Sequence, residues 1–555
     1  MPDASRHHLP RRTMLRAAAT AGAASLAVSP QALAGKASAK PSTAAFQHGV
    51  ASGDPLPHAV LIWTRITPTP QATPGSGRGE AASLRWEVSR DATFTNIVRN
   101  GTTTTSAARD HTVTVDVTGL EPATHYFYRF VSLGGATAGQ LSPVGRTKTA
   151  PAATADPEQL RMGFVSCANY EAGYFTAYRR LSEHDDLDAI VMLGDYIYEY
   201  PHNGYVGPKG AIRTVAPLHN VVRLADYRLR LATHRTDPDL QRAHRLFPWI
   251  CTVDDHEIVD NAYADGTTGD NPHDPKRDGS WRARKRAAFQ AYTEWMPVRW
   301  SGNLDNPHLY RTLKFGKLAD LSMLDLRSYR TIQPDIASAT ADSPQATITG
   351  KPQMDWLIGE LRRSQARWQL VGNSVMISPL LVPPLDRRTT GAITEALGLP
   401  SQGIAVNTDQ WDGYSHDRAT LFSAIVKSNV RNPVFMTGDI HTSWANDLPV
   451  DAAAYPGAGT AGVEFVAPSV TANSVAESVG IPDGNLGPAV AAVQAVNNHV
   501  RWAQLDQHGY VLLTVTRAAA TASWHLLSDV TVPNSPEHVA ARWKVRDGRR
   551  RVERA

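Results

Sequence analysis

Short apolar runs that end in polar, potentially metal-ligating residues recur along most of this chain. The clearest of these runs occupy residues 163–165, 189–193, 247–253, 368–371 and 434–436. Each is typical of a buried strand, so the polar residues after it should lie just past the strand's carboxyl end, where open α/β sheets place their chemistry. Helical patterns at 174–183 and 282–295 lie between the runs. The alternation predicts an α/β fold.

The first part of the chain is rich in Thr and Val and has little helical periodicity. Residues 61–63, 84–88 and 112–117 are typical of strands separated by turns. Residues 120–129 (LEPATHYFYR) match the tyrosine corner of a fibronectin-like sandwich, whose aromatic side chains are core. We therefore expect an N-terminal all-β, fibronectin-III-like domain over residues 43–148.

The rest of the chain divides into a catalytic domain and a tail. Ala-rich residues 150–153 with Pro157 predict a linker, and the catalytic domain should occupy residues 158–530. Two late strands, at 462–466 and 509–515, indicate a second sheet facing the first. Residues 531–555 form a basic end, which we expect to be solvated rather than a binding arm.

Residues 1–34 predict a twin-arginine signal peptide, although an ordinary flexible N-terminus is the alternative. Arg11 and Arg12 precede an Ala-rich apolar run that is too short to span a membrane, and the run closes with an A-x-A cleavage site. The segment also carries a net charge of +3 out of the formal +4 of the whole chain. We therefore expect a secreted protein without a nucleic-acid or anionic-membrane patch. We also expect a monomer without a specific nucleic-acid partner, and transient contact with a membrane surface stays open.

Two motifs that directly follow predicted strands carry the strongest chemical signal. GDYIY offers Asp195 and Tyr198, and GDIHTSW offers Asp439 and His441. A two-metal hydrolase needs a carboxylate that bridges both ions, and Asp195 suits that position because Tyr198 can reach the same ion. A phenolate from Tyr198 beside a thiolate from Cys167 suits Fe³⁺, and His441 would complete the ligand set of that ion.

The chain has only two cysteines, Cys167 and Cys251. A single disulfide is one interpretation for an exported protein. The other is that Cys167 alone is a metal ligand, because it lies among polar residues in the stretch SCANY. We favour the second.

A third motif, DDHE at residues 254–257, places two adjacent carboxylates beside a histidine. A helix N-cap could account for one of these acids, but hardly for both. Asp255 and Asp439 offer only oxygen, which suits Ca²⁺ or Mn²⁺ more than Zn²⁺. His256 is then free for proton transfer near neutral pH.

With these motifs in place, residues from about 45 to 530 resemble the PhoD-type alkaline phosphatase/phosphodiesterase family, which includes secreted actinobacterial members described as phospholipase D. The matching stretches are SCANY, GDYIY, DDHE, GNS at 372–374, GDIH, VRW at 500–502 and HGY at 508–510. The resemblance implies an α/β/β/α metallophosphoesterase sandwich that holds Fe³⁺ and one or two Ca²⁺. Mn²⁺ and Zn²⁺ are the alternatives.

Residue by residue, the resemblance implies distinct ligand sets. The residues implied for iron are Cys167, Asp195, Tyr198 and His441, with Asp195 also bridging to calcium. Asp255 and Asp439 would complete the calcium shell, and Asp254 is the candidate for a further calcium. The sequence departs from the related purple acid phosphatases, with DDHE in place of GNHE and Asp439 in place of a histidine. Both departures exchange neutral ligands for anionic oxygen and so favour Ca²⁺ over Zn²⁺.

The expected reaction is in-line attack on phosphorus by a metal-bridging oxide or hydroxide, with His256 assisting the leaving oxygen. Arginines should clamp the phosphoryl oxygens. The candidate clamps are Arg235, Arg327 and Arg501, and Asn169 and Asn373 are candidate supporting or substrate residues.

The favoured function is a secreted phosphoesterase that cleaves phosphodiesters, including phospholipid head groups, and also phosphomonoesters. A lipid-active enzyme should have an apolar rim at the metals, which residues 378–385 and 393–399 could supply unless they form a loop packed on the core. The H-x-K-x₄-D motif of common phospholipases D is absent from the sequence. The alternatives are a phosphate-scavenging phosphatase without lipid preference, a di-zinc or di-manganese hydrolase of other esters, and a non-enzymatic calcium-binding protein.

Overall fold

The computed structural model describes residues 44–385, 394, 397–481 and 484–555. These described residues form one compact unit. The predicted signal peptide lies outside the described residues. None of the helices in the described part is both long and apolar enough to cross a membrane.

Two sheets form the centre of the fold. The larger runs in the order β27 (Glu553–Arg554), β26 (Glu537–Arg546), β25 (Ala519–Leu527), β24 (Gly509–Thr516), β8 (Gln159–Val165), β9 (Ala189–Met192), β10 (Pro248–Cys251), β1 (Val50–Leu56), β2 (Ala59–Arg65) and β5 (Thr112–Thr118). The smaller runs in the order β15 (Arg311–Phe315), β16 (Ala319–Met323), β17 (Trp368–Asn373), β20 (Pro433–Thr437), β22 (Thr460–Val466), β21 (Ser443–Pro449) and β23 (Val500–Gln504).

The predicted second sheet exists, but its two late strands were assigned wrongly, because they lie in different sheets. Strand β22 pairs in parallel with β20 in the smaller sheet, and β24 pairs antiparallel with β8 in the larger. Apolar pattern alone predicts a strand but not its neighbour, which depends on pairing across long stretches of chain.

Strand β9 shows why the apolar runs are continuous. Ile190 and Met192 pack into the core beneath the helices of the larger sheet, whereas Ala189 and Val191 pack into the core between the two sheets. Successive side chains of a strand point to opposite faces, so a strand buried on both faces has no polar position.

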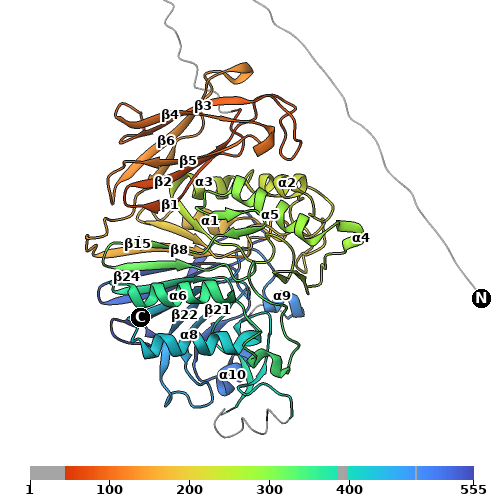
Figure 1. Cartoon of the computed structure of the whole chain (residues 1–555), viewed down its shortest axis with the longest axis vertical. Coiled ribbons are helices and arrows are strands. Elements are labelled where there is room, and N and C mark those ends of the chain that lie inside the picture. Colours follow the sequence, from red (N-terminus) through yellow and green to blue (C-terminus); the bar gives the residue numbers. More distant parts are fainter. Residues whose placement is uncertain (1–43, 386–393, 395–396, 482–483) are drawn as a thin grey trace, which may run out of the picture. The chain divides into compact units, whose positions relative to one another are not determined.

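Helices cover the outer face of each sheet (Figure 1). The larger sheet is covered by α1 (Thr176–Leu181), α2 (Leu224–His234), α3 (Pro238–Leu246) and α5 (Trp281–Trp295), and the smaller by α6 (Gly350–Arg363) and α8 (Ser415–Lys427). The short helices α9 (Val475–Val479) and α10 (Gly487–Val496) follow later in the chain. The layers are therefore α/β/β/α, and the two predicted helices correspond to α1 and α5.

Residues 50–148 form a two-layer β structure that shares a sheet with the rest of the chain. A four-stranded sheet of β4 (Ile97–Thr105), β3 (Ala82–Ser89), β6 (His125–Ser132) and β7 (Gly145–Lys148) packs on β1, β2 and β5 around one apolar core. The Tyr126 hydroxyl accepts a hydrogen bond of 2.9 Å from the Glu121 N–H, a contact to the upstream backbone of the kind that tyrosine corners make. Because β1 pairs in parallel with β10, the large sheet is continuous across residue 150.

The expected tail at residues 531–555 is largely paired strand, although most of its side chains are exposed or half-buried, as predicted. Residues Glu537–Arg546 form β26, which pairs with β25 over most of its length, and β27 pairs with β26. Trp543 and Val545 are buried between charged neighbours. The basic residues are thus one face of a strand near the sheet edge.

A buried ion pair ties β1 to the smaller sheet. The Asp54 carboxylate lies 2.8 Å from Arg311 Nε and also accepts the backbone N–H of Arg299 at 2.5 Å. Asp54 is fully buried. Arg299 makes a second, half-exposed pair with Asp116.

We expect Asp54→Ala to lower the free energy of unfolding by about 3–5 kcal/mol, because the Arg311 guanidinium, 14% exposed, then loses its fully buried carboxylate partner. Asp116→Ala removes an exposed carboxylate and should cost about 0–1 kcal/mol. Denaturant unfolding of both variants measures the difference. Equal losses would contradict the assignment of Asp54 as the tie between these segments.

Candidate metal centre

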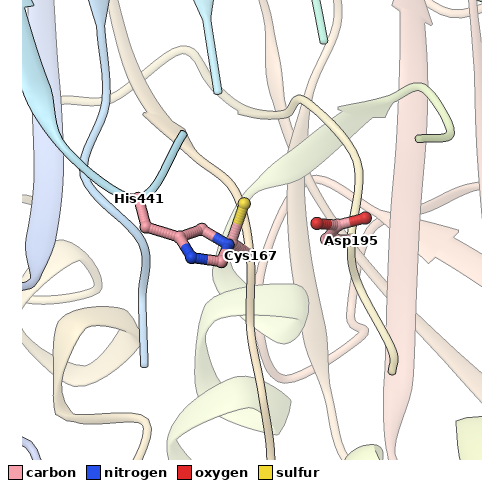
Figure 2. Close-up of side chains that lie close together, drawn as sticks. All are labelled: Cys167, Asp195 and His441. Carbon is pink, nitrogen blue, oxygen red and sulfur yellow. The ribbon is translucent and has the colours of Figure 1, made fainter. Parts of the chain in front are cut away.

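The predicted strand-end motifs converge on one point. Cys167 follows β8, Asp195 follows β9, and His441 follows β20. One ligating atom from each lies within 4.8 Å of the other two. Figure 2 shows the Cys167 sulfur, the His441 ring and the Asp195 carboxylate entering from separate segments. Sulfur, nitrogen and oxygen donors in this arrangement could hold one metal ion.

Tyr198 completes this first cluster. Its hydroxyl lies 3.1 Å from Asp195 Oδ2 and 3.2 Å from His441 Nε2. His441 Nδ1 lies 2.8 Å from the carbonyl oxygen of Asn473. That carbonyl fixes the proton on Nδ1 and leaves Nε2 available as a ligand, which is how metal-binding histidines are commonly oriented.

A second cluster lies directly beside the first. It contains three carboxylates whose oxygens lie within 4.8 Å of one another, those of Asp254, Asp255 and Asp439. An oxygen of Asp195 lies equally close to ligating atoms of Asp255 and His256. Asp195 belongs to both neighbourhoods, as a bridging carboxylate must. The DDHE motif lies in a turn after β10, so the helix-cap interpretation was wrong.

Four of these residues have left-handed backbone conformations. The φ angles are +60° at Cys167, +55° at Asp195, +67° at Asp439 and +54° at His441. Each such residue costs on the order of 1–3 kcal/mol, and such strain gathers at functional sites. The loops are therefore held in these conformations by the surrounding structure.

The glycine that begins each GD motif allows two loops to touch. A Cβ on Gly194 would lie 2.4 Å from the Asp254 Cβ, and one on Gly438 would lie 2.6 Å from the Ser166 side chain. Gly194 also has a φ of +109°, which side-chain-bearing residues rarely adopt. The glycines therefore determine how closely the ligand loops approach.

Glu257 holds the ligand-bearing loops together through hydrogen bonds to their backbone. Its carboxylate accepts backbone N–H groups of Asp195 at 3.1 Å, Tyr196 at 2.6 Å and Asp254 at 2.7 Å. Burial raises the pKa of Glu257 to about 8, although the Asp254 and Tyr196 N–H groups act to lower it. This acid of the DDHE motif is thus structural.

Arg327, one of the predicted phosphoryl clamps, lies within the acidic cluster, and its role toward a phosphoryl group stays a prediction. It is fully buried and pairs with Asp254, with Asp409 at 3.0 Å and with Asp439 at 3.1 Å. In this structure its guanidinium fixes the carboxylates. Arg330 holds Asp409 from the other side at 2.6 Å.

The clusters are short of positive charge. Burial, followed by the neighbouring carboxylates, raises the pKa of Cys167 and of Tyr198 well above their ordinary values. Burial and the charge of Asp254 raise the pKa of Asp439 in the same way. Asp254 Oδ2 is buried and accepts no hydrogen bond from any residue that the structure describes. Cations would favour the charged form of each of these groups, so the donor set fits bound metal ions.

His256 lies beside the metal clusters and is held by a buried glutamate. Its Nδ1 lies 2.8 Å from Glu199 Oε2, and its ring lies 4.2 Å from that of Tyr198. Burial alone would lower the pKa of His256, but the charges of Asp255, Asp195 and Glu199 raise it well above the ordinary value. The side chain is 7% exposed.

Two of the predicted arginine clamps were wrong. Arg235 is fully buried, and its guanidinium carbon lies 4.4 Å from the centroid of the Trp63 ring. One of its nitrogens donates a hydrogen bond to the Trp295 carbonyl. Arg501 is exposed on β23, and its described polar contact is with the Tyr455 hydroxyl. Packing between layers and at a sheet edge accounts for these arginines, and neither contacts a described residue of the metal clusters.

The predicted supporting residues also have structural partners. Asn169 donates to the Tyr205 carbonyl at 2.7 Å. Asn373 donates to the Thr437 hydroxyl and accepts from the Trp411 indole, both at 2.9 Å. Both cysteines are free thiols in the described part of the chain, so the disulfide interpretation was wrong.

Sequence reasoning missed Glu199, Asp409 and Arg330. Glu199 directly follows the GDYIY motif, so its place in the same loop was a usable signal. Asp409 and Arg330 come from segments without a strand-end motif, and only tertiary packing brings them to Arg327.

Comparison with known proteins agrees with this geometry. The model of the PhoD-like phosphatase family matches residues 162–524, and that of the PhoD-like phosphatase N-terminal domain matches residues 31–151. The chain is 36% identical over 503 residues to alkaline phosphatase D of Bacillus subtilis (strain 168), covering 88% of this chain and 79% of the relative.

Two solved structures are also similar. The structure of PhoD superposes with a TM-score of 0.80 at 34% identity, covering 94% of this chain and 93% of that one. A purple acid phosphatase from yellow lupin shares the fold, with a TM-score of 0.50 at 10% identity and coverage of 88% and 73%.

Asp195→Asn should lower kcat/KM for a phosphoester by more than about 100-fold, because changes to residues that merely orient metal ligands already cost about 10–100-fold. Steady-state kinetics with equal amounts of folded protein measure the loss. Cys251→Ser is the matched control, because this buried thiol lies in β10 outside both clusters, and it should retain activity. An active Asp195→Asn variant would contradict the bridging role.

Proposed function

Because the chain belongs to the PhoD-like phosphatase family and is therefore a phosphoesterase, we propose that it is an exported, metal-dependent phosphodiesterase that removes head groups from phospholipids. The observation that carries the lipid preference is an apolar groove at the metal centre. Export is inferred from the twin-arginine motif at Arg11 and Arg12.

The groove has a volume of about 600 Å³ and includes two of the candidate metal ligands, Asp439 and His441, in its wall. Most of its other lining is aliphatic. These lining residues include Leu380, Val382, Val406, Val475, Val493 and Val496. A phosphate at the metals would therefore have hydrocarbon-lined space beside it.

Water reaches much of this apolar surface. Val382 is 52% exposed and Val406 is 55% exposed, and Val496 on α10 is 42% exposed. Large contiguous exposed apolar patches commonly mark ligand-binding grooves or interaction sites. Burying an acyl chain here would contribute about 0.8 kcal/mol per CH₂ group. Leu380 and Val382, from the predicted rim at residues 378–385, line this groove, which supports the proposal, whereas Leu381 packs inward. The other predicted rim segment, residues 393–399, lies partly outside the described residues.

The donor set supports two kinds of metal ion. Cys167, Asp195, Tyr198 and His441 would hold Fe³⁺, since thiolate and phenolate suit that ion. Asp254, Asp255 and Asp439 would hold Ca²⁺ through oxygen alone. When bound, the cations supply Lewis-acid stabilisation of the charge that develops on the phosphoryl oxygens, and they acidify water.

The chain's own residues orient the site and move the proton. Glu199 holds Nδ1 of His256, so Nε2 is the atom that can protonate the departing alcohol oxygen. Arg327 keeps Asp254 and Asp439 in fixed positions. The aliphatic wall excludes water from one side of the substrate.

A second candidate is a phosphate-scavenging alkaline phosphatase without lipid preference. The observation in its favour is the similarity to alkaline phosphatase D. It predicts equal efficiency on substrates with and without acyl chains.

Tyr198→Phe should remove a visible charge-transfer band from protein purified in its exported form, because the phenolate is the proposed source of that band. Absorption spectra with elemental analysis of the same samples measure band, iron and calcium. A colourless, iron-free and fully active wild type would overturn the iron assignment and favour a divalent-metal hydrolase.

Val496→Asp and Val406→Asp should lower kcat/KM for phosphatidylcholine about tenfold, equivalent to about 1.4 kcal/mol, while leaving glycerophosphocholine hydrolysis unchanged. Choline release measures both reactions, and the two substrates differ only in acyl chains. Val539→Asp is the matched control, because Val539 is 38% exposed on β26 and does not line the groove. If kcat/KM stayed unchanged for both substrates, or fell equally for both, the lipid preference would be overturned and the second candidate favoured.

A further inference from the structure

A third group of ligating side chains lies outside the phosphoesterase centre. His184, His525 and Glu537 each bring one ligating atom within 4.8 Å of the other two. None of them belongs to the clusters around Asp195. Tyr510 is in contact with the group through its hydroxyl, which lies 3.0 Å from His184 Nε2 and 2.7 Å from Glu537 Oε2.

The strand register builds this group. Tyr510 on β24 is paired directly with His525 on β25, and their rings stack at 5.0 Å with an interplanar angle of 15°. His525 is paired with Val539 on β26, so Glu537, two residues earlier, lies on the same face. His184 reaches the group from the turn after α1. Three adjacent strands and one loop thus hold the donors.

One imidazole nitrogen in the group has no hydrogen-bond partner. His525 is 8% exposed, and its Nδ1 makes no hydrogen bond with a described residue. It lies 3.5 Å from Glu537 Oε1 without a well-directed bond. A bound ion between the two side chains would replace this long contact with direct bonds to both.

We propose that His184, His525 and Glu537 bind one Zn²⁺. Two imidazoles and one carboxylate form a recognised zinc ligand set, with Zn–N distances of about 2.0–2.1 Å and a fourth position for water or another ligand. Nitrogen donors exclude Ca²⁺ as the preferred ion.

The ion would connect the C-terminal strands to the helical layer. Strand β26 lies next to the edge of the larger sheet and is otherwise held by β25 and β27. His184 belongs to the segment after α1, on the helix-covered face. A zinc ion here is a structural link, and hydrolysis would not require it.

Zinc content of the full-length, metal-loaded enzyme tests the site. Wild type, His184→Gln and Glu537→Gln are equilibrated with Zn²⁺, desalted and compared by elemental analysis. Both altered residues are partly exposed, so the variants should fold, and circular dichroism with glycerophosphocholine hydrolysis checks this. His538→Gln is the matched control, because this exposed histidine of β26 pairs with Leu526 and belongs to the opposite face.

We expect wild type and His538→Gln to hold about one zinc ion per chain more than His184→Gln and Glu537→Gln. Added Zn²⁺ should raise the Tm of the first pair by several degrees and leave that of the second pair unchanged, because only binding to the folded state stabilises it. Anomalous scattering at the zinc edge should locate the ion between the three side chains. Equal zinc content in all four proteins, or zinc found only at the Asp195 centre, would overturn the proposal.

Discussion

Mutual repulsion among buried carboxylates is the constraint around which this fold is arranged. Asp195, Asp254, Asp255 and Asp439 meet where the two sheets deliver their strand ends, and burial raises the cost of every uncompensated charge. Arg327 offsets part of this charge. His256 offsets a further part. The pKa values of Asp195 and Asp439 nevertheless stay raised among the described residues, so affinity for cations follows from the position of the acids.

The loops that carry the ligands are held by interactions made below them. Glu257 binds three backbone N–H groups, and Gly194 and Gly438 allow the loops to touch. These contacts offset the strain of the left-handed ligand residues. The same loops present Asp439 and His441 to the apolar groove, so the proposed lipid site and the metal centre share one wall.

The sequence was sufficient to predict the parts of the site that local pattern determines. Asp195, Tyr198, Asp439 and His441 could be assigned because each follows an apolar run within a few residues, and strand ends converge in α/β sheets. Arginine positions could not be assigned in this way. Arg327 lies in the site, whereas Arg235 and Arg501 lie elsewhere, because long side chains are placed by tertiary packing. The prediction that β22 and β24 share one sheet was also wrong, because strand pairing depends on tertiary packing as well.

The pairing of β1 with β10 has a consequence for how this protein can be divided. A front segment that ends in a linker suggests a module that could be removed or exchanged without harm. Here, removing it would strip a parallel neighbour from the strand that precedes Asp254 and expose a new sheet edge prone to association. The catalytic half is therefore not a separable fragment, and grafting a different front domain would require a donor whose first strand matches the register of β10.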